Sequence, residues 1–202
     1  MPLGPAQGVA FIGATALECK ALQRALPHAR VVQTGIALAD LKEPLGDAVV
    51  SCGLAGGLRR RLPAGTVVIP REVRRPDGSV LYCDQELTEA LIAAARRLHL
   101  EPIVEPLLTS DSIVNGPERA RWAALGYAAV DMETGRLRAA RVAAVRVILD
   151  TPENELSGDW VNPLRAMLRP RNWPQAFWLA RTAPRAAALS ASVVAATQGI
   201  GA

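Results

Sequence analysis

Cysteine, histidine and aromatic residues are all scarce in this chain of 202 residues. The cysteines, Cys19, Cys52 and Cys83, are odd in number and far apart, which indicates reduced thiols rather than a disulfide framework or a zinc site. The histidines are His28 and His99 alone, and each suits a surface or helix-end position, so the sequence disfavours a histidine-dependent nucleophile. Aromatic residues make up 4% of a chain that is 50% hydrophobic, so its core must consist mainly of alanine, leucine, valine and isoleucine.

Long hydrophobic runs are missing as well. No apolar run reaches the roughly 20 residues that a membrane-spanning helix needs, and the first residues lack the basic-then-apolar pattern of a signal peptide. We therefore expect a cytoplasmic protein, with residues 1–202 forming one domain. The formal charge of +4 is carried mainly by arginine and suits phosphate-bearing ligands, nucleic acid or an anionic membrane. A protein with this charge can also bind none of these three partners, and we expect no nucleic-acid partner.

Short apolar runs alternate with amphipathic segments as far as residue 150. The predicted strands are 8–13, 30–34, 47–52, 66–69, 103–109, 128–132 and 145–149. The predicted helices are 15–26, 86–98, 117–125 and 134–144. The strands are apolar throughout rather than alternating, as in a sheet covered on both faces. The sequence thus predicts the α/β class, a three-layer αβα sandwich around a central mixed, largely parallel sheet.

The composition changes after residue 150. Residues 151–174 contain four prolines, two tryptophans and several arginines, and residues 175–196 are alanine-rich and helical in pattern. We interpret residues 151–202 as a loop rich in Trp, Arg and Pro, followed by a C-terminal helix of the same domain.

Residues suited to ligand binding follow four of the predicted strands. They are residues 13–18, 53–57, 131–133 and Asp150. Because ligands bind at the carboxyl ends of strands in α/β sheets, this coincidence predicts a site at that edge.

Each group has a simpler alternative. The glycine-rich segment 51–58 either brings backbone N–H groups close to a ligand or makes an ordinary tight turn. It matches neither a dinucleotide-binding loop nor a P-loop. Asp131 and Glu133 would point away from Met132 and either bind ribose hydroxyls or cap the next helix, with capping the stronger rival for Asp131. Asp150 could be a simple turn residue at the end of a strand.

Five segments together resemble the family of purine nucleoside phosphorylases, uridine phosphorylases and methylthioadenosine/adenosylhomocysteine nucleosidases. They are FIGA (11–14) with Glu18, SCGLAGGLRRRLPAGTVVIP (51–70), TSDSIV (109–114), AAVDMET (128–134) and VRVILD (145–150). The resemblance spans roughly residues 8–151, in the right order and approximate spacing. It implies the nucleoside phosphorylase-like fold and cleavage of an N-glycosidic bond, with no metal or cofactor and with inorganic phosphate as the one candidate co-substrate.

The resemblance implies a role for each of two catalytic carboxyl groups. Asp150 matches the aspartate that gives a proton to the purine at N7, which improves the base as a leaving group. Glu18 matches the glutamate that orients or deprotonates the attacking water in the nucleosidases.

It also implies the substrate-binding residues. Met132 and Glu133 match the ribose-binding pair, and the carboxylate of Glu133 would accept from a 2′- or 3′-hydroxyl group and stabilise an oxocarbenium-like sugar. The backbone of Ala55 and Gly56 would line the site near the ribose, and Val114 would contact the base through its main chain.

Several positions depart from the family pattern. Leu149 replaces a common serine, and Ile113 replaces an aromatic residue that stacks on the base. Residues 51–52 occupy the stretch where some phosphorylases have a phosphate-binding arginine, so hydrolysis and phosphorolysis both stay open. The segments 35–51 and 133–145 are shorter than in the family, which indicates that two helices are trimmed.

The segment DWVNPLRAMLRPRNWPQAFW (159–178) combines tryptophan with arginine. This composition is typical of a peripheral membrane contact or of the mouth of a site for an apolar ligand, or else of a packed helix with snorkelling arginines. The segment is similar to the hopanoid-biosynthesis-associated phosphorylase branch, which implies adenosylhopane as an adenine nucleoside substrate with an apolar 5′ group. The alternatives are a nucleosidase for a small nucleoside and a non-catalytic nucleoside-binding relative. The resemblance also implies a homo-oligomer, and we expect a dimer.

Overall fold

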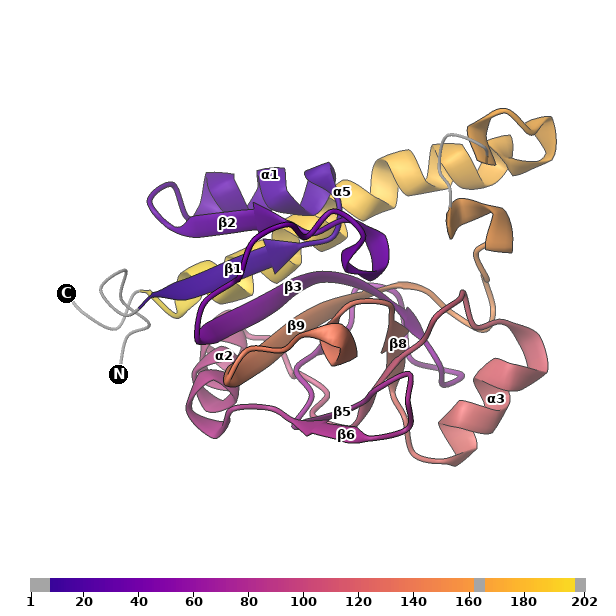
Figure 1. Cartoon of the computed structure of the whole chain (residues 1–202). Helices are drawn as coiled ribbons and strands as arrows, with labels where there is room; N and C mark the ends of the chain where they lie inside the picture. Colours follow the sequence, from indigo (N-terminus) through magenta and orange to yellow (C-terminus); the bar gives the residue numbers. More distant parts are fainter. Residues whose placement is uncertain (1–7, 162–165, 199–202) are drawn as a thin grey trace.

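The strands of this protein form a mixed sheet (Figure 1). The structure is a computed structural model that describes residues 8–161 and 166–198. Within them the strands are β1 (Val9–Gly13), β2 (Arg30–Gln33), β3 (Ala48–Gly57), β4 (Val67–Val68), β5 (Glu72–Arg74), β6 (Val80–Tyr82), β7 (Leu107–Thr109), β8 (Ala129–Asp131) and β9 (Arg141–Asp150). The sheet order is β2-β1-β3-β8-β7-β5-β6, and β9 pairs with β3 and β4. The pairs β1–β2, β1–β3, β3–β9, β5–β7 and β7–β8 are parallel, which confirms the predicted α/β class with a mixed, largely parallel sheet.

The predicted helices are confirmed except for one. The structure has α1 (Ala16–Ala25), α2 (Gln85–Arg97), α3 (Gly116–Ala124) and α5 (Trp173–Ala196), with short 3₁₀ turns η2 (Ile36–Leu38), η3 (Thr134–Arg136), η4 (Gly158–Val161) and η5 (Pro170–Asn172). Helix α1 begins at a capping box in which the side chains of Thr15 and Glu18 each bond the backbone N–H of the other. At the start of α2, the side chain of Asp84 accepts a hydrogen bond from the backbone N–H of Leu87.

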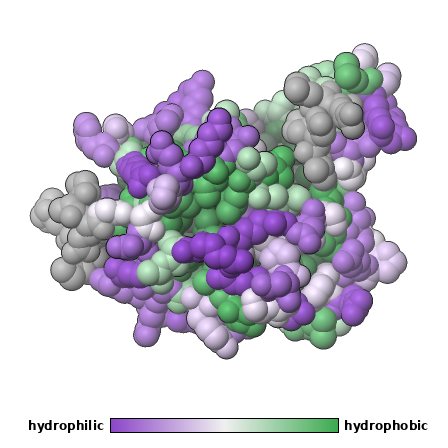
Figure 2. Space-filling model, viewed as in Figure 1, coloured by the Kyte–Doolittle hydropathy of each residue, from purple (hydrophilic) through white to green (hydrophobic). Residues whose placement is uncertain are grey.

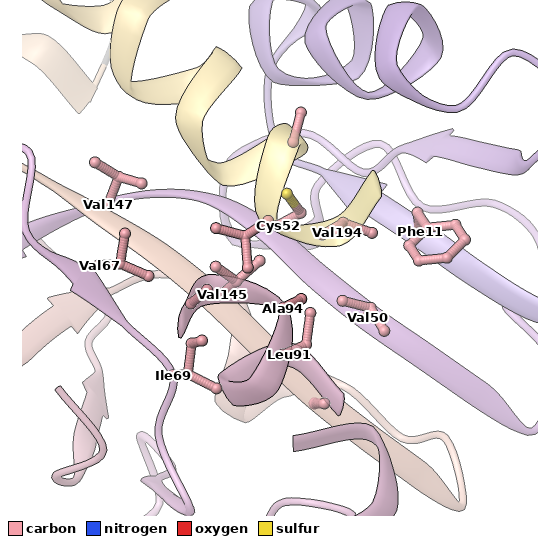
Figure 3. Close-up of a cluster of buried hydrophobic side chains, with 14 of the residues drawn as sticks. Phe11, Val50, Cys52, Val67, Ile69, Leu91, Ala94, Val145, Val147 and Val194 are labelled. Carbon is pink, nitrogen blue, oxygen red and sulfur yellow. The ribbon is translucent and has the colours of Figure 1, made fainter. Parts of the chain in front are cut away.

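Alternate residues of the central strands face two separate hydrophobic clusters. Val50 of β3 belongs to the larger cluster, where it is buried together with Leu22 of α1, Leu91 of α2 and Val194 of α5 (Figure 3). Its neighbour Val49 belongs to the smaller cluster on the opposite face of the sheet. The three helices therefore share one face of the sheet.

The opposite face is covered differently from the prediction. Its half-buried cover includes Leu38, Leu41 and Ala139, which lie in turns and loops. The helix predicted at 134–144 is wrong, because only the turn η3 forms there and β9 already begins at Arg141. The physical reason is the length of β3, which offers a parallel partner to β9 from Ala48 to Gly56 and so draws an alanine-rich segment into the sheet.

Three further segments differ from the prediction. The glycine cluster is not a turn, because β3 continues through it to Gly57, with an irregular register between Ala55 and Gly56. The hairpin of β5 and β6 was missed, although the Pro76-Asp77-Gly78 sequence between its strands is a turn signal. Strand β7 begins later than predicted, with Ile103 making only an isolated bridge to Val68.

Helix α5 follows the Trp- and Arg-rich segment as predicted, although it begins two residues earlier than the predicted 175–196. Its C-terminal half packs on α1 and on the sheet, while its N-terminal end projects away from the sheet (Figure 1, upper right). Within residues 8–161 and 166–198, no helix combines the length and apolarity that crossing a membrane requires.

Candidate active site

A cavity lies at the carboxyl ends of β1, β3, β8 and β9, the edge at which the sequence predicted a site. All the predicted site residues line it: Glu18, Ala55, Gly56, Val114, Met132, Glu133 and Asp150. Its volume of about 220 Å³ is below the range of roughly 300–1,000 Å³ that is common for small-molecule sites. A ligand larger than a compact nucleoside would therefore extend outside it. In the part of the chain that the structure describes, no cluster of His, Cys, Asp and Glu side chains suits a metal ion.

Asp150 is the last residue of β9, and its side chain is buried. Its Oδ2 atom accepts hydrogen bonds from Nη2 of Arg119 at 2.6 Å and from the backbone N–H of Leu156 at 3.4 Å. Both donors reach the same oxygen. The other oxygen, Oδ1, lies against Gly56 in the cavity wall, where an added Cβ would be 3.1 Å from it.

Arg119 of α3 is the partner of Asp150 that the sequence analysis missed. It is 1% exposed and also donates to the carbonyl oxygen of Gly57 at 3.0 Å. A buried guanidinium without a counter-ion is strongly destabilising, so each member of this pair holds the other in place. The sequence held one indication that Arg119 points inward, its helical spacing. Arg119 stands three and four residues before Trp122 and Ala123, which pack on a hydrophobic cluster.

Glu133 is held at the opposite end of the lining by backbone donors. Its Oε1 accepts from the N–H of Ala37 at 3.1 Å, and its Oε2 accepts from the N–H of Met132 at 3.3 Å. Ala37 and Leu38 have φ values of 55° and 63°, a left-handed conformation that side chains disfavour. Such a turn persists only where its surroundings fix it, and the bond to Glu133 is one such constraint.

Asp131, in contrast, is occupied by a buried polar network. It accepts from the hydroxyl of Thr109 at 2.6 Å, from the backbone N–H of Thr134 at 3.1 Å and from Nε of Arg146 at 2.9 Å. The N–H bond from Thr134 ties Asp131 to the first residue of the turn η3, although the residue at the N-cap position of that turn is Glu133. Arg146 also donates to the hydroxyl of Ser51 at 2.6 Å, which draws that side chain into the network.

This network sets the charge state of its neighbour. Burial, reinforced by the Asp131 carboxylate, raises the pKa of Glu133 to about 7. The Arg146 guanidinium, 3.9 Å from Oε2 of Glu133, opposes the rise only in part. Glu133 therefore gains its negative charge near neutral pH.

Glu18 has both a structural role and a place in the cavity. Its Oε2 accepts from the N–H and the hydroxyl of Thr15, both at 2.8 Å, as the third residue of the capping box. Its Oε1 accepts from the N–H of Leu54 in β3 at 2.9 Å. The carboxylate is thus fixed between α1 and β3, with one lone pair of Oε1 still unused by these bonds.

Glycine at position 53 allows the Glu18 carboxylate to lie close to the sheet. A Cβ added to Gly53 would lie 2.2 Å from Oε1 of Glu18 and 3.3 Å from Nη1 of Arg146. Close approach, and not a turn, is therefore the reason for glycine at this position.

The rest of the lining is mainly apolar. Ile113 and Leu149 both line the cavity at the positions that depart from the family pattern. The carbonyl oxygen of Val114 accepts from Nε of Arg119 at 3.2 Å. Ile36, Leu156 and Trp160 are half-buried apolar residues of the lining that keep some exposure to solvent, and we term these three residues the apolar opening.

A family model of the phosphorylase superfamily matches residues 12–162. The chain belongs to this superfamily. The match covers most of the chain, and it confirms an enzyme of the phosphorylase and nucleosidase class. A search of curated proteins found no match.

Solved structures share the superfamily fold with this chain. A 5′-methylthioadenosine/S-adenosylhomocysteine nucleosidase of Neisseria meningitidis, in complex with methylthio-immucillin-A, has a TM-score of 0.70 at 22% identity, and the match covers 94% of this chain and 97% of that one. A nucleosidase of the same kind from Colwellia psychrerythraea, in complex with adenine, has a TM-score of 0.67 at 20% identity over 95% and 94%. A futalosine hydrolase mutant of Helicobacter pylori has a TM-score of 0.68 at 14% identity over 94% and 97%.

Gly53→Ala should destabilise this superfamily member, because the new methyl group must displace Glu18 from its bonds to Thr15 and Leu54. We expect a loss of about 1–3 kcal/mol in the free energy of unfolding, measured by urea denaturation. Gly158→Ala is the matched control, because nothing lies within 4 Å of the added Cβ there. Equal stability of both variants would contradict the role given to Gly53.

Glu133 predicts a pH dependence of stability. Its pKa is about 7 in the folded protein against an ordinary value of 4.5, so the folded state holds the proton more tightly than the unfolded chain. Stability should therefore fall as the pH rises from 4.5 to 7, by roughly 3 kcal/mol in total. Urea denaturation at a series of pH values should show this fall to be absent in Glu133→Gln.

The control for this series is Glu153→Gln, which changes an exposed glutamate and should follow the wild-type curve. If the Glu133→Gln curve also runs parallel to the wild type, Glu133 is not the titrating group.

Proposed function

We propose that this chain cleaves the N-glycosidic bond of an adenine nucleoside. The observation that carries the proposal is the presence of Asp150, Glu133 and Glu18 in one cavity, where each is held by protein donors. Such an arrangement suits a reaction in which a base, a sugar and a nucleophile each meet a separate carboxyl group. The structural neighbours that bind adenine or methylthio-immucillin-A support the choice of an adenine nucleoside.

Asp150 is the proposed catalytic residue at the base. Because Arg119 and Leu156 both occupy Oδ2, the oxygen available to N7 of the purine is Oδ1. A proton shared between Oδ1 and N7 moves to the base as the C1′–N9 bond stretches, which makes the base a better leaving group. The Arg119 guanidinium stabilises the carboxylate that remains, so Arg119 acts as a positioning residue.

Glu133 and Glu18 are the proposed residues at the sugar and the nucleophile. The carboxylate of Glu133 accepts a hydrogen bond from a ribose hydroxyl group and stabilises the positive charge that develops on the sugar ring. Met132 packs beside it, and the backbone of Ala55 and Gly56 lines the same part of the cavity. Glu18 orients the attacking water through the remaining lone pair of Oε1.

The lining favours water over phosphate. Among the described lining residues the one cationic side chain is Arg119, and it is bonded to Asp150. Ser51, which stands where some phosphorylases have arginine, is buried against Arg146. We therefore expect base release in plain buffer, with phosphate as the alternative nucleophile.

The proposed substrate is adenosylhopane, which yields adenine and a ribosylated hopanoid, in hopanoid biosynthesis. The small cavity volume and the apolar opening at Ile36, Leu156 and Trp160 support a nucleoside whose large apolar 5′ group lies outside the cavity. The second candidate is methylthioadenosine or adenosylhomocysteine, favoured by the neighbouring nucleosidases. We expect a cytoplasmic homodimer, which light scattering of the purified chain tests.

Asp150→Asn should reduce kcat by about 10²–10⁴-fold while nucleoside affinity stays within a few-fold, because the amide keeps an acceptor for Arg119 but cannot supply the proton. Turnover and calorimetric binding measure the two effects separately. The control is Asp111→Asn, an exposed aspartate, which should behave as the wild type. Normal turnover by Asp150→Asn would show that the proposed mechanism is wrong. It would not support non-catalytic binding, because the chain would still turn over its substrate.

The substrate is tested by chromatographic release of adenine from adenosylhopane and from methylthioadenosine, each with and without phosphate. We expect release from adenosylhopane without phosphate. A requirement for phosphate would make the chain a phosphorylase, and release from methylthioadenosine alone would replace the proposed substrate. Silence with both nucleosides would favour a nucleoside with a different base.

A further inference from the structure

Exposed hydrophobic side chains gather on the projecting end of α5. Among the large hydrophobic residues that the structure exposes, four of nine fall within residues 167–177. They are Met167, Leu168, Trp173 and Phe177, between 55% and 82% exposed. We term this group the apolar tip. Figure 2 (upper right) shows both hydrophobic and hydrophilic atoms on the surface of this projection.

The charge on the outer surface behind the tip has one sign. Trp173, Phe177, Arg181 and Arg185 follow one another at intervals of four residues and are all exposed, so the apolar tip continues into a basic stripe along α5. Helix α5 contains no aspartate or glutamate. An apolar end followed by a cationic face is the pattern of a helix that lies in the surface of an anionic bilayer.

Helix α1 extends the same basic surface. It packs beside α5 and contributes exposed Lys20 and Arg24, which line a shallow groove with Pro184 of α5. The acidic residue of α1, Glu18, is buried in the active site. The two neighbouring helices therefore present cations and apolar side chains outward, without an exposed carboxylate of their own.

Two other arginines near the tip, in the part of the chain that the structure describes, are paired with a carboxylate. Arg169 and Arg171 both donate to Asp159 of η4, and Asn172 donates to the same carboxylate at 3.0 Å. This cluster fixes the start of α5 against η4. Among residues 8–161 and 166–198, no ion pair is formed by Lys20 and Arg24 of α1 or by Arg181 and Arg185 of α5.

The tip is joined to the active site by hydrogen bonds. The side chain of Gln175, between Trp173 and Phe177 in sequence, accepts from Nε1 of Trp160 at 2.8 Å and donates to the carbonyl oxygen of Glu155 at 2.9 Å. Trp160 belongs to the apolar opening. Because Gln175 is two residues from both Trp173 and Phe177, it faces the opposite side of α5, so the same end of the helix carries the tip outward and contacts the apolar opening on its inner side.

We propose that the apolar tip inserts into the surface of an anionic lipid bilayer, with the basic stripe of α5 and the cations of α1 lying on the lipid headgroups. The apolar opening then lies near the lipid boundary, on the inner side of the same end of α5, and a nucleoside with an apolar 5′ group reaches the cavity from that boundary. This second step rests on the proposed function, whereas the docking itself does not.

The test is co-sedimentation of the full chain with vesicles of 30 mol% phosphatidylglycerol in phosphatidylcholine, and with vesicles of phosphatidylcholine alone. We expect binding to the anionic vesicles, reduced at least tenfold in the double variant Trp173→Ser/Phe177→Ser and in Arg181→Glu/Arg185→Glu. The matched control is Tyr82→Ser/Leu125→Ser, which removes equally exposed hydrophobic side chains elsewhere and should bind as the wild type. Circular dichroism should show all three variants folded, since every changed residue is exposed.

Three results would overturn the proposal: no binding to either vesicle, equal binding by the tip variant, or equal binding by the control and tip variants at a reduced level. A loss of dimer mass in the tip variant, measured by light scattering, would instead assign the tip to contact with a second copy of the chain. Base release from adenosylhopane and from methylthioadenosine, measured without vesicles, keeps the two proposals apart. A chain that releases base but ignores vesicles refutes the docking alone, and a chain that binds vesicles but releases no base refutes the proposed function alone.

Discussion

The parallel pairing of β3 with β9 is the interaction on which the rest of the site depends. It runs from Ala48 beside Arg141 to Gly56 beside Asp150, so one ladder of backbone hydrogen bonds fixes the height of every functional group along it. The glycines of β3 make room for Glu18 on one strand face and for Asp150 near its end. A shift of one residue in this register would reverse the faces and separate the carboxylates.

Two buried arginines hold carboxylates of the site in place. Arg119 holds Asp150, and Arg146 holds Asp131 beneath Glu133. Buried ion pairs of this kind add little net stability, but the loss of one partner leaves a charge that the interior cannot solvate. Their value lies in orientation, because each guanidinium bonds several fixed acceptors at once.

The sequence predicted the parts of this arrangement that local pattern controls. Asp150 and Glu133 were found because each follows an apolar strand, and the ends of strands are visible in a pattern. The helix expected at 134–144 failed because pairing with β3 is a tertiary effect that outweighs the helical preference of alanine. Arg119 was missed because an arginine on a short helix is usually solvated, and only the fold reveals that α3 turns it inward.

Gln175 makes three hydrogen bonds to the segment that borders the cavity, reaching Ser157, Trp160 and Glu155. One side chain of α5 thereby sets the position of a wall of the active site. Binding free energies that are coupled through such a joint are reciprocal. If a contact at the far end of α5 raises the affinity of the cavity for its ligand by some factor, a ligand bound in the cavity raises the affinity of that contact by the same factor.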